Sequence, residues 1–455
     1  MATEDLIEAM DLLSLEDAKK VNESSAITPA LDPGLDIFRP SSTDIGIKDT
    51  RLIEYSPLAA VSQGGAIQFH IPSTNLYWLS FNKSWLKIRA KIIRATDDKD
   101  VEESDQVSVI NALGHTMWRQ CDISLQQRGM SNDIGPLYCY KSILDLMAYT
   151  PCEYLETGMQ TALYYKDTPG AIDSTALTAD GTNKGLIERR EFVKKGEFLM
   201  TVNLNHDLAK IERFLPPGIE IRITLHRNPS EYIIMAPIPT EIFRLRITEC
   251  TLFMHAAELS SGALVKQHEL LQSNHAYYYY KRSILKSFTI PSGVTSWSIT
   301  QPFGTIIPVD SIFCFVPTTH FQGSQTKNPH FFAHLNINYM QFRAEGYQNQ
   351  TLLLDFTQNH LSEIYQRLYE PDVGQIHLAG ALQLKDLKGD QCLYRIKLGN
   401  TSHERYFRAK HGQTHFAFTT TEALEQSYTL IAYGRVHDFF ALDQFKNIYT
   451  SDQYL

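Results

Sequence analysis

Apolar and polar residues alternate along several segments of the chain, most clearly in Trp85–Ile93 (WLKIRAKII). In an extended chain Leu86 and Ile88 point to one side, whereas Lys87 and Arg89 point to the other. This period of two is typical of a strand that packs one side on a core and keeps the other in water. The pattern therefore predicts a protein built mainly of β-strands.

The same signals recur in two series of strands, separated by the proline-containing connector Pro229–Pro239 (PSEYIIMAPIP). We expect the first series at Ala66–Ile71, Trp85–Ile93, Cys121–Leu125, Phe198–Leu204 and Ile219–Leu225. We expect the second at Phe243–Met254, Tyr277–Ile290, Ser296–Thr300, Ile312–Val316, Ile337–Phe342, Leu393–Leu398, His415–Phe418 and Tyr428–Phe440. Helical spacing of apolar residues predicts helices at Leu137–Tyr149, Leu259–Leu271 and His360–Tyr369.

The two series share a layout, although no residue-level repeat links them. Each opens with a long alternating strand pair, contains a helix and ends with a regular alternating strand. Many short strands in two blocks favour sandwiches over α/β folds. We therefore expect an all-β fold of two tandem antiparallel jelly-roll β-sandwiches, with short inserted helices and an N-terminal arm. The expected divisions are an arm at residues 1–34, a first jelly roll at 35–236 and a second at 237–455.

The arm has the spacing of an amphipathic helix, with Leu6, Ile7, Met10 and Leu13 as candidate contact residues. Residues 1–23 contain seven acidic side chains against two lysines, so the arm is acidic. It is either a partly disordered tail or a segment that becomes helical when its apolar side meets a partner. The acidity argues against an anionic membrane as that partner.

Four consecutive tyrosines, Tyr277, Tyr278, Tyr279 and Tyr280, precede Lys281 and Arg282 in the sequence. Aromatic rings beside positive charge are typical of stacking platforms for single-stranded nucleic acid. A regular strand would instead turn alternate rings to opposite sides, so the four rings would not form one continuous surface. We favour the strand and expect these six residues at an interface or at a sandwich end.

Composition narrows the function further. The formal net charge of −9 argues against a general binder of polyanions, and no stretch approaches the roughly 18 apolar residues of a membrane span. No secretory signal is evident at the start of the sequence, and the six cysteines show no CxxC spacing, so we expect reduced thiols.

Sequence motifs for catalysis are lacking. His268-Glu269-Leu270-Leu271-Gln272 misses the zinc-protease pattern HExxH because a glutamine replaces the second imidazole. His330 and His334 are four residues apart, as are His411 and His415, and structural or surface roles explain both pairs better than metal binding. No GxSxG, P-loop or GxGxxG motif occurs. We therefore expect no enzyme activity, catalytic residue, cofactor or metal.

The order of several segments resembles the major capsid protein of Polintons (Mavericks) and the related adintoviruses, from about residue 35 to residue 445. The segments that carry the resemblance are LDIF (Leu35–Phe38), EYSPL (Glu54–Leu58), WRQCDISLQQRG (Trp118–Gly129), LYCYKSILDLMAY (Leu137–Tyr149), ALYYKDTPGAID (Ala162–Asp173), GLIERREF (Gly185–Phe192), YKRSILKSFTIPSG (Tyr280–Gly293), FQGSQTKNPHFF (Phe321–Phe332) and LNINYMQFRAEG (Leu335–Gly346). The acidic arm and Thr357–Gln391 depart from this pattern.

The resemblance implies a structural protein with two upright sandwiches per chain. It implies homotrimers that act as pseudo-hexagonal, hexon-like capsomers, which pack against neighbouring capsomers and penton or minor capsid proteins. The resulting icosahedral shell would enclose double-stranded DNA that the chain touches only indirectly. The expected location is the virion, with synthesis in the host cytoplasm and assembly in the nucleus.

Two alternatives remain open. One is a β-sandwich module that binds glycans or a receptor, suggested by Tyr164 and Tyr165 next to the loop Thr168–Gly185, which we expect to be long and exposed. The other is a domesticated, capsid-derived host protein with a different role. Self-assembly of the purified chain separates the capsid from the binding module, and neighbouring genes separate a virus from a host copy.

Overall fold

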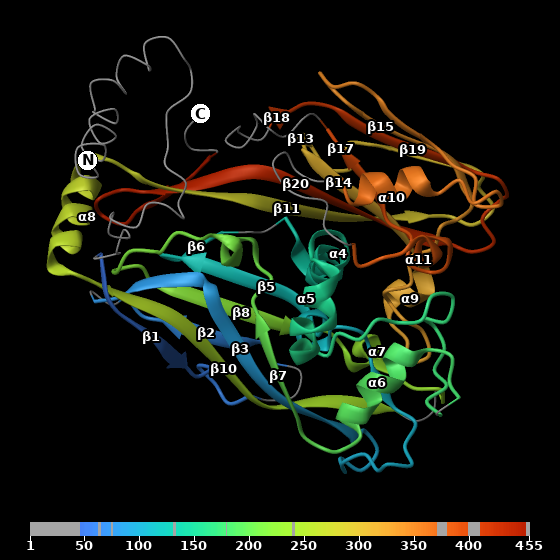
Figure 1. Cartoon of the computed structure of the whole chain (residues 1–455), viewed down its shortest axis with the longest axis horizontal. Helices are drawn as coiled ribbons and strands as arrows, with labels where there is room; N and C mark the ends of the chain where they lie inside the picture. Colours follow the sequence, from blue (N-terminus) through green and yellow to red (C-terminus); the bar gives the residue numbers. More distant parts are fainter. Residues whose placement is uncertain are drawn as a thin grey trace, which may run out of the picture. The chain divides into compact units, whose positions relative to one another are not determined.

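Antiparallel strands are the main type of regular structure in the chain, as the alternating pattern predicts (Figure 1). The computed structural model describes residues 46–61, 65–73, 76–130, 133–178, 180–238, 242–370, 380–398 and 410–451. Within the chain, Ile47–Leu455 forms one unit and Met1–Gly46 another. The candidate arm contacts Leu6, Ile7, Met10 and Leu13 lie outside the described residues.

The first sandwich consists of two antiparallel four-stranded sheets. The strands of one sheet are, in spatial order, β1 (Ile47–Tyr55), β10 (Phe243–Leu259), β3 (Trp78–Arg94) and β7 (Phe198–Asn203). Those of the other are β2 (Ile67–Ile71), β8 (Ile221–Arg227), β5 (Trp118–Leu125) and β6 (Arg128–Gly129). A separate short pair, β4 (Ser108–Val109) and β9 (Ile234–Met235), accompanies them.

The second sandwich repeats this plan. One sheet has the order β11 (Ala276–Ile290), β20 (Tyr428–Leu442), β14 (Asp310–Pro317) and β17 (Tyr394–Lys397), with β21 (Ile448–Thr450) paired to β20. The other has the order β12 (Ser296–Thr300), β19 (Thr414–Thr420), β15 (Ile337–Ala344) and β16 (Gln350–Leu353). A short pair, β13 (Ile306–Ile307) and β18 (Lys410–His411), stands apart.

Both sandwiches have jelly-roll topology. When the strands of the four main sheets are counted along the chain within each sandwich, one sheet joins the first, eighth, third and sixth strands. The facing sheet joins the second, seventh, fourth and fifth. This order is the same in the two halves, so the predicted fold of two tandem antiparallel jelly rolls is confirmed.

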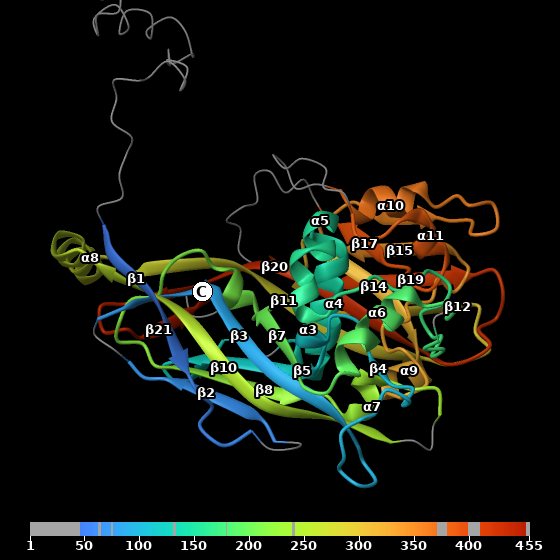
Figure 2. The same cartoon turned by 60° about the horizontal axis from the view of Figure 1, so that its bottom comes forward.

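Short helices occupy the connections between the strands (Figure 2). They are α3 (Leu113–Thr116), α4 (Tyr138–Tyr149), α5 (Cys152–Glu156), α6 (Lys184–Val193), α7 (Ser230–Ile233), α8 (Ser261–Ser273), α9 (Thr318–Gln322), α10 (Ser362–Leu368) and α11 (Leu384–Lys388), with 3-10 turns η1 (Gly135–Leu137), η2 (Gly158–Ala162) and η3 (Asp207–Lys210). The three predicted helices correspond to α4, α8 and α10. No helix among the described residues is long and apolar enough to cross a membrane.

The strand pairing differs from the expected division at residues 236 and 237. The sequence pattern places β10 at the start of the second series, but β10 pairs with β1 and β3 and is the last strand of the first sandwich. The segment expected to be a connector contains α7 and β9, and β9 pairs with β4. The polypeptide passes from one sandwich to the other through α8, because β10 precedes this helix and β11 follows it.

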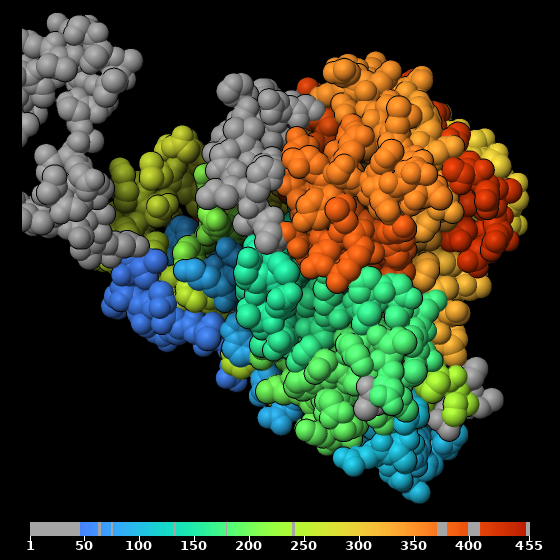
Figure 3. All heavy atoms as spheres, turned by 45° about the vertical axis from the view of Figure 1, so that its right-hand side comes forward, coloured from blue at the N-terminus to red at the C-terminus, as the bar shows by residue number. Residues whose placement is uncertain are grey.

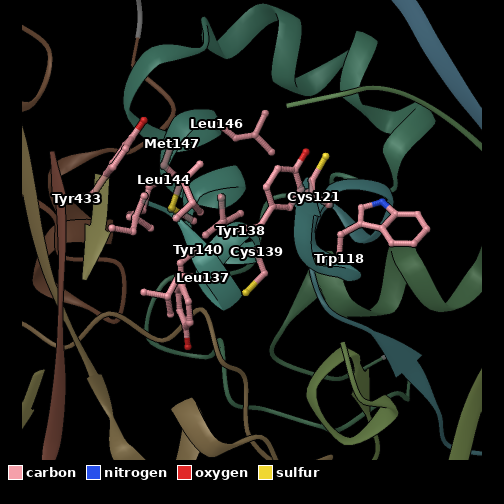
Figure 4. Close-up of a cluster of buried hydrophobic side chains, with 14 of the residues drawn as sticks. Trp118, Cys121, Leu137, Tyr138, Cys139, Tyr140, Leu144, Leu146, Met147 and Tyr433 are labelled. Carbon is pink, nitrogen blue, oxygen red and sulfur yellow. The ribbon is translucent and has the colours of Figure 1, made fainter. Parts of the chain in front are cut away.

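Apolar side chains of both sandwiches and the intervening helices form one buried cluster. α4 lies within it, and eleven of its twelve residues are buried. Figure 4 shows Leu144 and Met147 of α4, with Tyr433 of β20 at the edge of the group. The two sandwiches therefore share a core around α4.

Candidate functional site

The tyrosine run lies on β11, and its rings alternate as predicted. Tyr278 is 4% exposed and stacks on Phe440 with ring centroids 4.7 Å apart. Tyr279 is 43% exposed, and its ring and that of Tyr277 both lie next to Phe439. The four rings therefore do not form one continuous platform.

The six candidate interface residues consequently divide into two sets. The Tyr278 hydroxyl donates to the backbone carbonyl of Phe214 (2.9 Å), and Arg282 forms ion pairs with Asp133 and Asp438. Phe214 and Asp133 belong to the first sandwich, so Tyr278 and Arg282 join the two sandwiches of one chain. Tyr280 and Lys281 are half-buried, whereas Tyr277 and Tyr279 are exposed; Lys281 lies on the same side of the strand as these two, and all three keep their candidacy for contacts outside the chain.

A buried ion network lies where α4 and η3 meet the second sandwich. The Lys141 ammonium, with no exposed side-chain surface, contacts Asp145 (2.8 Å) and Asp207 (3.2 Å). Lys210 contacts the same Asp145 oxygen at 2.7 Å. Burial alone would lower the pKa of Lys141, but the two carboxylates outweigh burial and raise it. Lys141, Asp145 and Asp207 therefore form a charged, enclosed cluster, which Lys210 contacts from a partly exposed position.

The second sandwich completes this network with neutral donors. The Tyr433 hydroxyl of β20 donates to Asp145 (2.6 Å). The backbone N–H and the hydroxyl of Ser283 on β11 both donate to Asp207, each at 2.8 Å. Charged groups of the first sandwich thus lie directly against polar groups of the second. We call this set of contacts the seam.

Next to these groups a second ion pair holds an aromatic ring between two guanidinium groups. Arg395 binds Asp310 through two N–H groups, at 2.9 and 2.7 Å, and the Tyr149 hydroxyl donates to the same carboxylate. The ring centroid of Tyr149 lies 4.8 Å from the Arg395 guanidinium and 3.8 Å from that of Arg435. Tyr149 comes from α4 and the other three residues from the second sandwich, so this group also belongs to the seam.

A cleft of about 830 Å³ opens along the seam. Its walls include Trp85 and Tyr154 from the first sandwich and Tyr279 and Phe439 from the second. Its charged lining consists of Asp145, Asp207, Lys210, Lys281, Arg435 and Asp438, with His115 and His437. The tyrosine run thus contributes to the wall of a cleft within the chain.

Three histidines, His115, His206 and His330, are buried with no carboxylate in contact among the described residues. Burial lowers the pKa of His115 and of His206 to about 4, and in each case the nearby Lys141 acts in the same direction. Burial lowers the pKa of His330 to about 3, and both of its ring nitrogens lack a hydrogen-bond partner in the part of the chain that the structure describes. All three are therefore neutral at pH 7.

The histidine spacings noted in the sequence do not form metal sites. His268 lies on α8 beside Gln272, with 3.2 Å between their side-chain nitrogens. His330 is buried against Tyr140, whereas His334 stacks on Phe356. Across the described ranges, no group of three potential ligands is placed to hold a metal ion.

Helix α8 is exposed along its whole length. None of its side chains is buried, and Leu264, Val265 and Leu270 are 42%, 55% and 43% exposed. A mainly apolar groove of about 590 Å³ lies between this helix and the strand ends, lined in part by Trp78 and Phe214. Figure 2 shows α8 at one end of the sandwiches, away from α4.

The segment Thr168–Gly185 is a long connection that leads into α6, as expected, but its described residues are only partly exposed, with Ile172, Leu177 and Asn183 buried. Asp390 accepts hydrogen bonds from the backbone N–H groups of Gly170 and Ile172, at 3.0 and 2.9 Å. Asp173 likewise binds His320 (2.7 Å), so this segment is fixed to the second sandwich of its own chain. In Figure 3 the green surface of the first sandwich meets the orange surface of the second.

The aromatic pair that suggested a ligand-binding loop is not exposed either. Tyr164 is buried and Tyr165 is half-buried against Phe192. A buried ring cannot serve as a glycan platform, so these residues no longer support the binding-module alternative.

The seam is not predicted by the sequence pattern, although α4 carries one signal of it. α4 (YCYKSILDLMAY) places Lys141 and Asp145 four residues apart in an otherwise apolar helix. Such a pair lies on one side of a helix, and opposite charges within a buried helix indicate a polar cluster. Its other members, Asp207 and Tyr433, come from distant parts of the sequence and carry no comparable local signal.

Comparison with known proteins supports the fold assignment. No protein-family model matches the chain, and no curated protein is significantly similar in sequence. Among solved structures, the Faustovirus major capsid protein matches with a TM-score of 0.57 and 9% identity, covering 95% of this chain and 98% of that one. A chain of the Sputnik virophage matches with a TM-score of 0.56, 10% identity and coverage of 94% and 93%. A chain of the PBCV-1 virus capsid matches with a TM-score of 0.54, 9% identity and coverage of 91% and 99%.

Identities this low establish the fold alone. The alignments nevertheless extend over almost the whole of each capsid chain and include both sandwiches of this one. The chain therefore has the double jelly-roll fold found in viral major capsid proteins.

Proposed function

We propose that the chain is the major capsid protein of a virus, with a structural rather than a catalytic role. The observation that carries this proposal is the pair of sandwiches with identical strand order, aligned over nearly the full length of viral capsid chains. Fold alone does not fix function, so surfaces suited to assembly provide the second support. Helix α8 presents three apolar side chains to solvent in the isolated chain.

The proposed assembly unit is a homotrimer. Two similar sandwiches per chain give a trimer six similar sides, and closed cyclic symmetry uses the same contact three times. Such a pseudo-hexagonal capsomer would pack against neighbouring capsomers and penton or minor capsid proteins in an icosahedral shell. The enclosed double-stranded DNA would touch the chain only indirectly, as the net charge of −9 supports.

The proposed setting follows the resemblance to Polinton and adintovirus capsid proteins. The mature location would be the virion, with synthesis in the host cytoplasm and assembly in the nucleus. Packaging-ATPase and protease genes beside this gene would support a virus, whereas an isolated gene under host control would indicate a domesticated copy.

Contact surfaces are proposed at α8 and at the accessible side of the tyrosine strand, Tyr277, Tyr279 and Lys281. Exposed apolar helices are costly in a monomer and typical of a subunit interface. We propose that a second copy of the chain covers α8. Tyr278 and Arg282 are left out of this surface because they already contact the first sandwich.

The N-terminal arm is proposed to act at capsomer contacts or inside the shell, through Leu6, Ile7, Met10 and Leu13. Deletion of residues 1–34 should leave trimers folded and reduce particle yield, measured by sedimentation and electron microscopy. A matched variant with these four residues changed to Ser should show the same loss. Normal particles from both proteins would contradict the role.

The test of the main proposal is the state of the purified full chain. Negative-stain electron microscopy should show trimers or particles, and light scattering should give their mass. Glycan binding by a stable monomer would favour the binding-module alternative instead.

A further inference from the structure

The cleft along the seam has the dimensions of a ligand site. Its volume of about 830 Å³ lies in the range of roughly 300–1,000 Å³ that is usual for small-molecule pockets. Strands and helices of both sandwiches form its walls, and aromatic rings such as Trp85 and Phe439 alternate with charged groups. The ligand that such a cleft accepts depends on which of its charged side chains have no oppositely charged partner.

Most cations at the seam have carboxylate partners. Lys141 has Asp145 and Asp207, Arg395 has Asp310, and Arg282 has Asp133 and Asp438. Arg435 is different. Its guanidinium lines the cleft and packs on the face of Tyr149, and it forms no ion pair with any carboxylate in the described part of the chain.

Arg435 is near carboxylates without contacting one. Lys141 and Lys210 contact the carboxylates of Asp145 and Asp207, whereas Arg435 is influenced by Asp310 and Asp145 but forms no ion pair with either, so its N–H groups that face the cleft are open to an added anion. Partial burial and the neighbouring cations Lys141 and Arg435 lower the pKa of Lys210 against the two carboxylates, and its side chain remains 49% exposed in the cleft. Removing a cation from water without a counter-ion is costly, so this arrangement favours the entry of an anion.

We propose that the cleft binds a small oxyanion, a phosphate or carboxylate group, between Arg435 and Lys210. The planar guanidinium offers paired N–H groups to two oxygens of such an anion, and the ammonium supplies a point charge. Lys210 has three N–H donors, and its contact with Asp145 accounts for one. The site is independent of the capsid proposal because it needs only one folded chain.

The position of the site gives the anion a structural consequence. Arg435 belongs to β20 in the second sandwich, and Lys210 belongs to η3 in the first. An anion bound to both therefore links the two sandwiches, and its binding free energy adds to the stability of the folded chain.

Isothermal titration calorimetry of the full chain with inorganic phosphate at pH 7, at constant ionic strength, tests the proposal. The wild-type chain should bind one phosphate per chain, and Arg435→Gln should weaken binding at least tenfold. Arg435→Lys keeps the positive charge but loses the paired N–H groups of the guanidinium, so it should bind phosphate with intermediate affinity. A second titration with acetate shows whether carboxylate is also accepted; binding of either anion supports the proposal.

The matched control is Arg367→Gln. Arg367 is a surface arginine already paired with Glu363 (2.7 Å), so this variant should bind phosphate like the wild type. Equal affinity of the wild type and Arg435→Gln, or no binding of either anion, would overturn the proposal. Arg435 would then be a structural residue that stacks on Tyr149.

A crystal grown with tungstate provides a test that does not depend on a variant folding. Tungstate is an oxyanion whose metal atom scatters strongly, so its position can be read directly from the anomalous signal. The proposal predicts an ion between Arg435 and Lys210. Tungstate bound elsewhere, with this position empty, would contradict it.

Discussion

The seam and helix α8 differ in how much of their surface the single chain buries. At the seam, Lys141 and its carboxylates are fully enclosed, and polar groups of both sandwiches satisfy one another. On α8 no side chain is buried, and apolar residues face solvent in the single chain. Side chains that are buried within the chain contribute to its folding free energy. Exposed apolar side chains such as those of α8 contribute only when a partner buries them. The difference predicts which changes unfold the molecule and which only stop its assembly.

The largest effect on folding should come from Lys141→Met. This change leaves Asp145 and Asp207 buried with less counter-charge, and breaking a buried ion pair costs about 3–5 kcal/mol. Urea denaturation followed by circular dichroism should show the loss. Lys48→Met, which breaks the exposed pair with Glu258, is the control and should unfold like the wild type. Equal midpoints for both variants would show that the seam does not stabilise the fold.

The second-largest effect on folding should come from low pH, which should lower the free energy of unfolding. His330 has a pKa of about 3 in the folded chain against 6.5 as its ordinary value. Between these two values the unfolded chain binds the proton more strongly, so stability is complete above pH 6.5 and falls as the pH decreases toward 3. At pH 5 this histidine should cost about 2 kcal/mol relative to pH 7.5.

Replacing His330 with Phe removes the titrating group and should flatten the dependence of unfolding free energy on pH. His115 and His206, which face Lys141, Lys210 and the carboxylates Asp145 or Asp207, should retain the remaining slope down to pH 4. The exposed His268→Phe on α8 serves as control. An unchanged slope in His330→Phe would refute the assignment.

A smaller change in unfolding free energy should distinguish the buried side of the tyrosine strand from its exposed side. Tyr278→Phe removes the hydrogen bond to Phe214 and should cost about 1 kcal/mol. Tyr279→Phe keeps its ring, which is 43% exposed and packs next to Phe439, and should cost less than Tyr278→Phe because water can reach this side of the strand. The same urea experiment measures both, and equal losses would mean that the alternation has no energetic consequence.

The smallest effect on folding is expected at α8. Changing Leu264, Val265 and Leu270 to Glu should leave the urea midpoint unchanged, because none of these side chains is buried. The same variant should lose trimers and particles, since charge replaces the apolar contact. The control carries Glu at Lys266, His268 and Gln272 on the same helix and should assemble. Normal assembly of the first variant would exclude α8 from the interface.

Local pattern predicted the elements well, because alternation within a strand depends only on its own residues. β11 and β20 were expected close to their observed bounds, and so was α4. The predicted boundary between the sandwiches failed because strand pairing is non-local. The prolines before β10 suggest a connector, yet its partners β1 and β3 begin 196 and 165 residues earlier in the sequence.

The candidate site was predicted less completely for the same reason. Alternation correctly placed Tyr278 and Tyr279 on different sides of a strand. It could not show that Arg282 reaches Asp133, or that Asp145 meets Tyr433, because these pairs are more than a hundred residues apart. The exposure of the loop Thr168–Gly185 was also overestimated, because its polar composition does not reveal that Asp390 accepts hydrogen bonds from the backbone of Gly170 and Ile172.

The molar mass of the purified full chain tests the central claim most directly. Light scattering coupled to size-exclusion chromatography, at several protein concentrations, should give three times the 51.9 kDa chain mass or a much larger particle. A mass of one chain at every concentration, from protein with a cooperative urea transition, would contradict the account of this chain as a capsid protein.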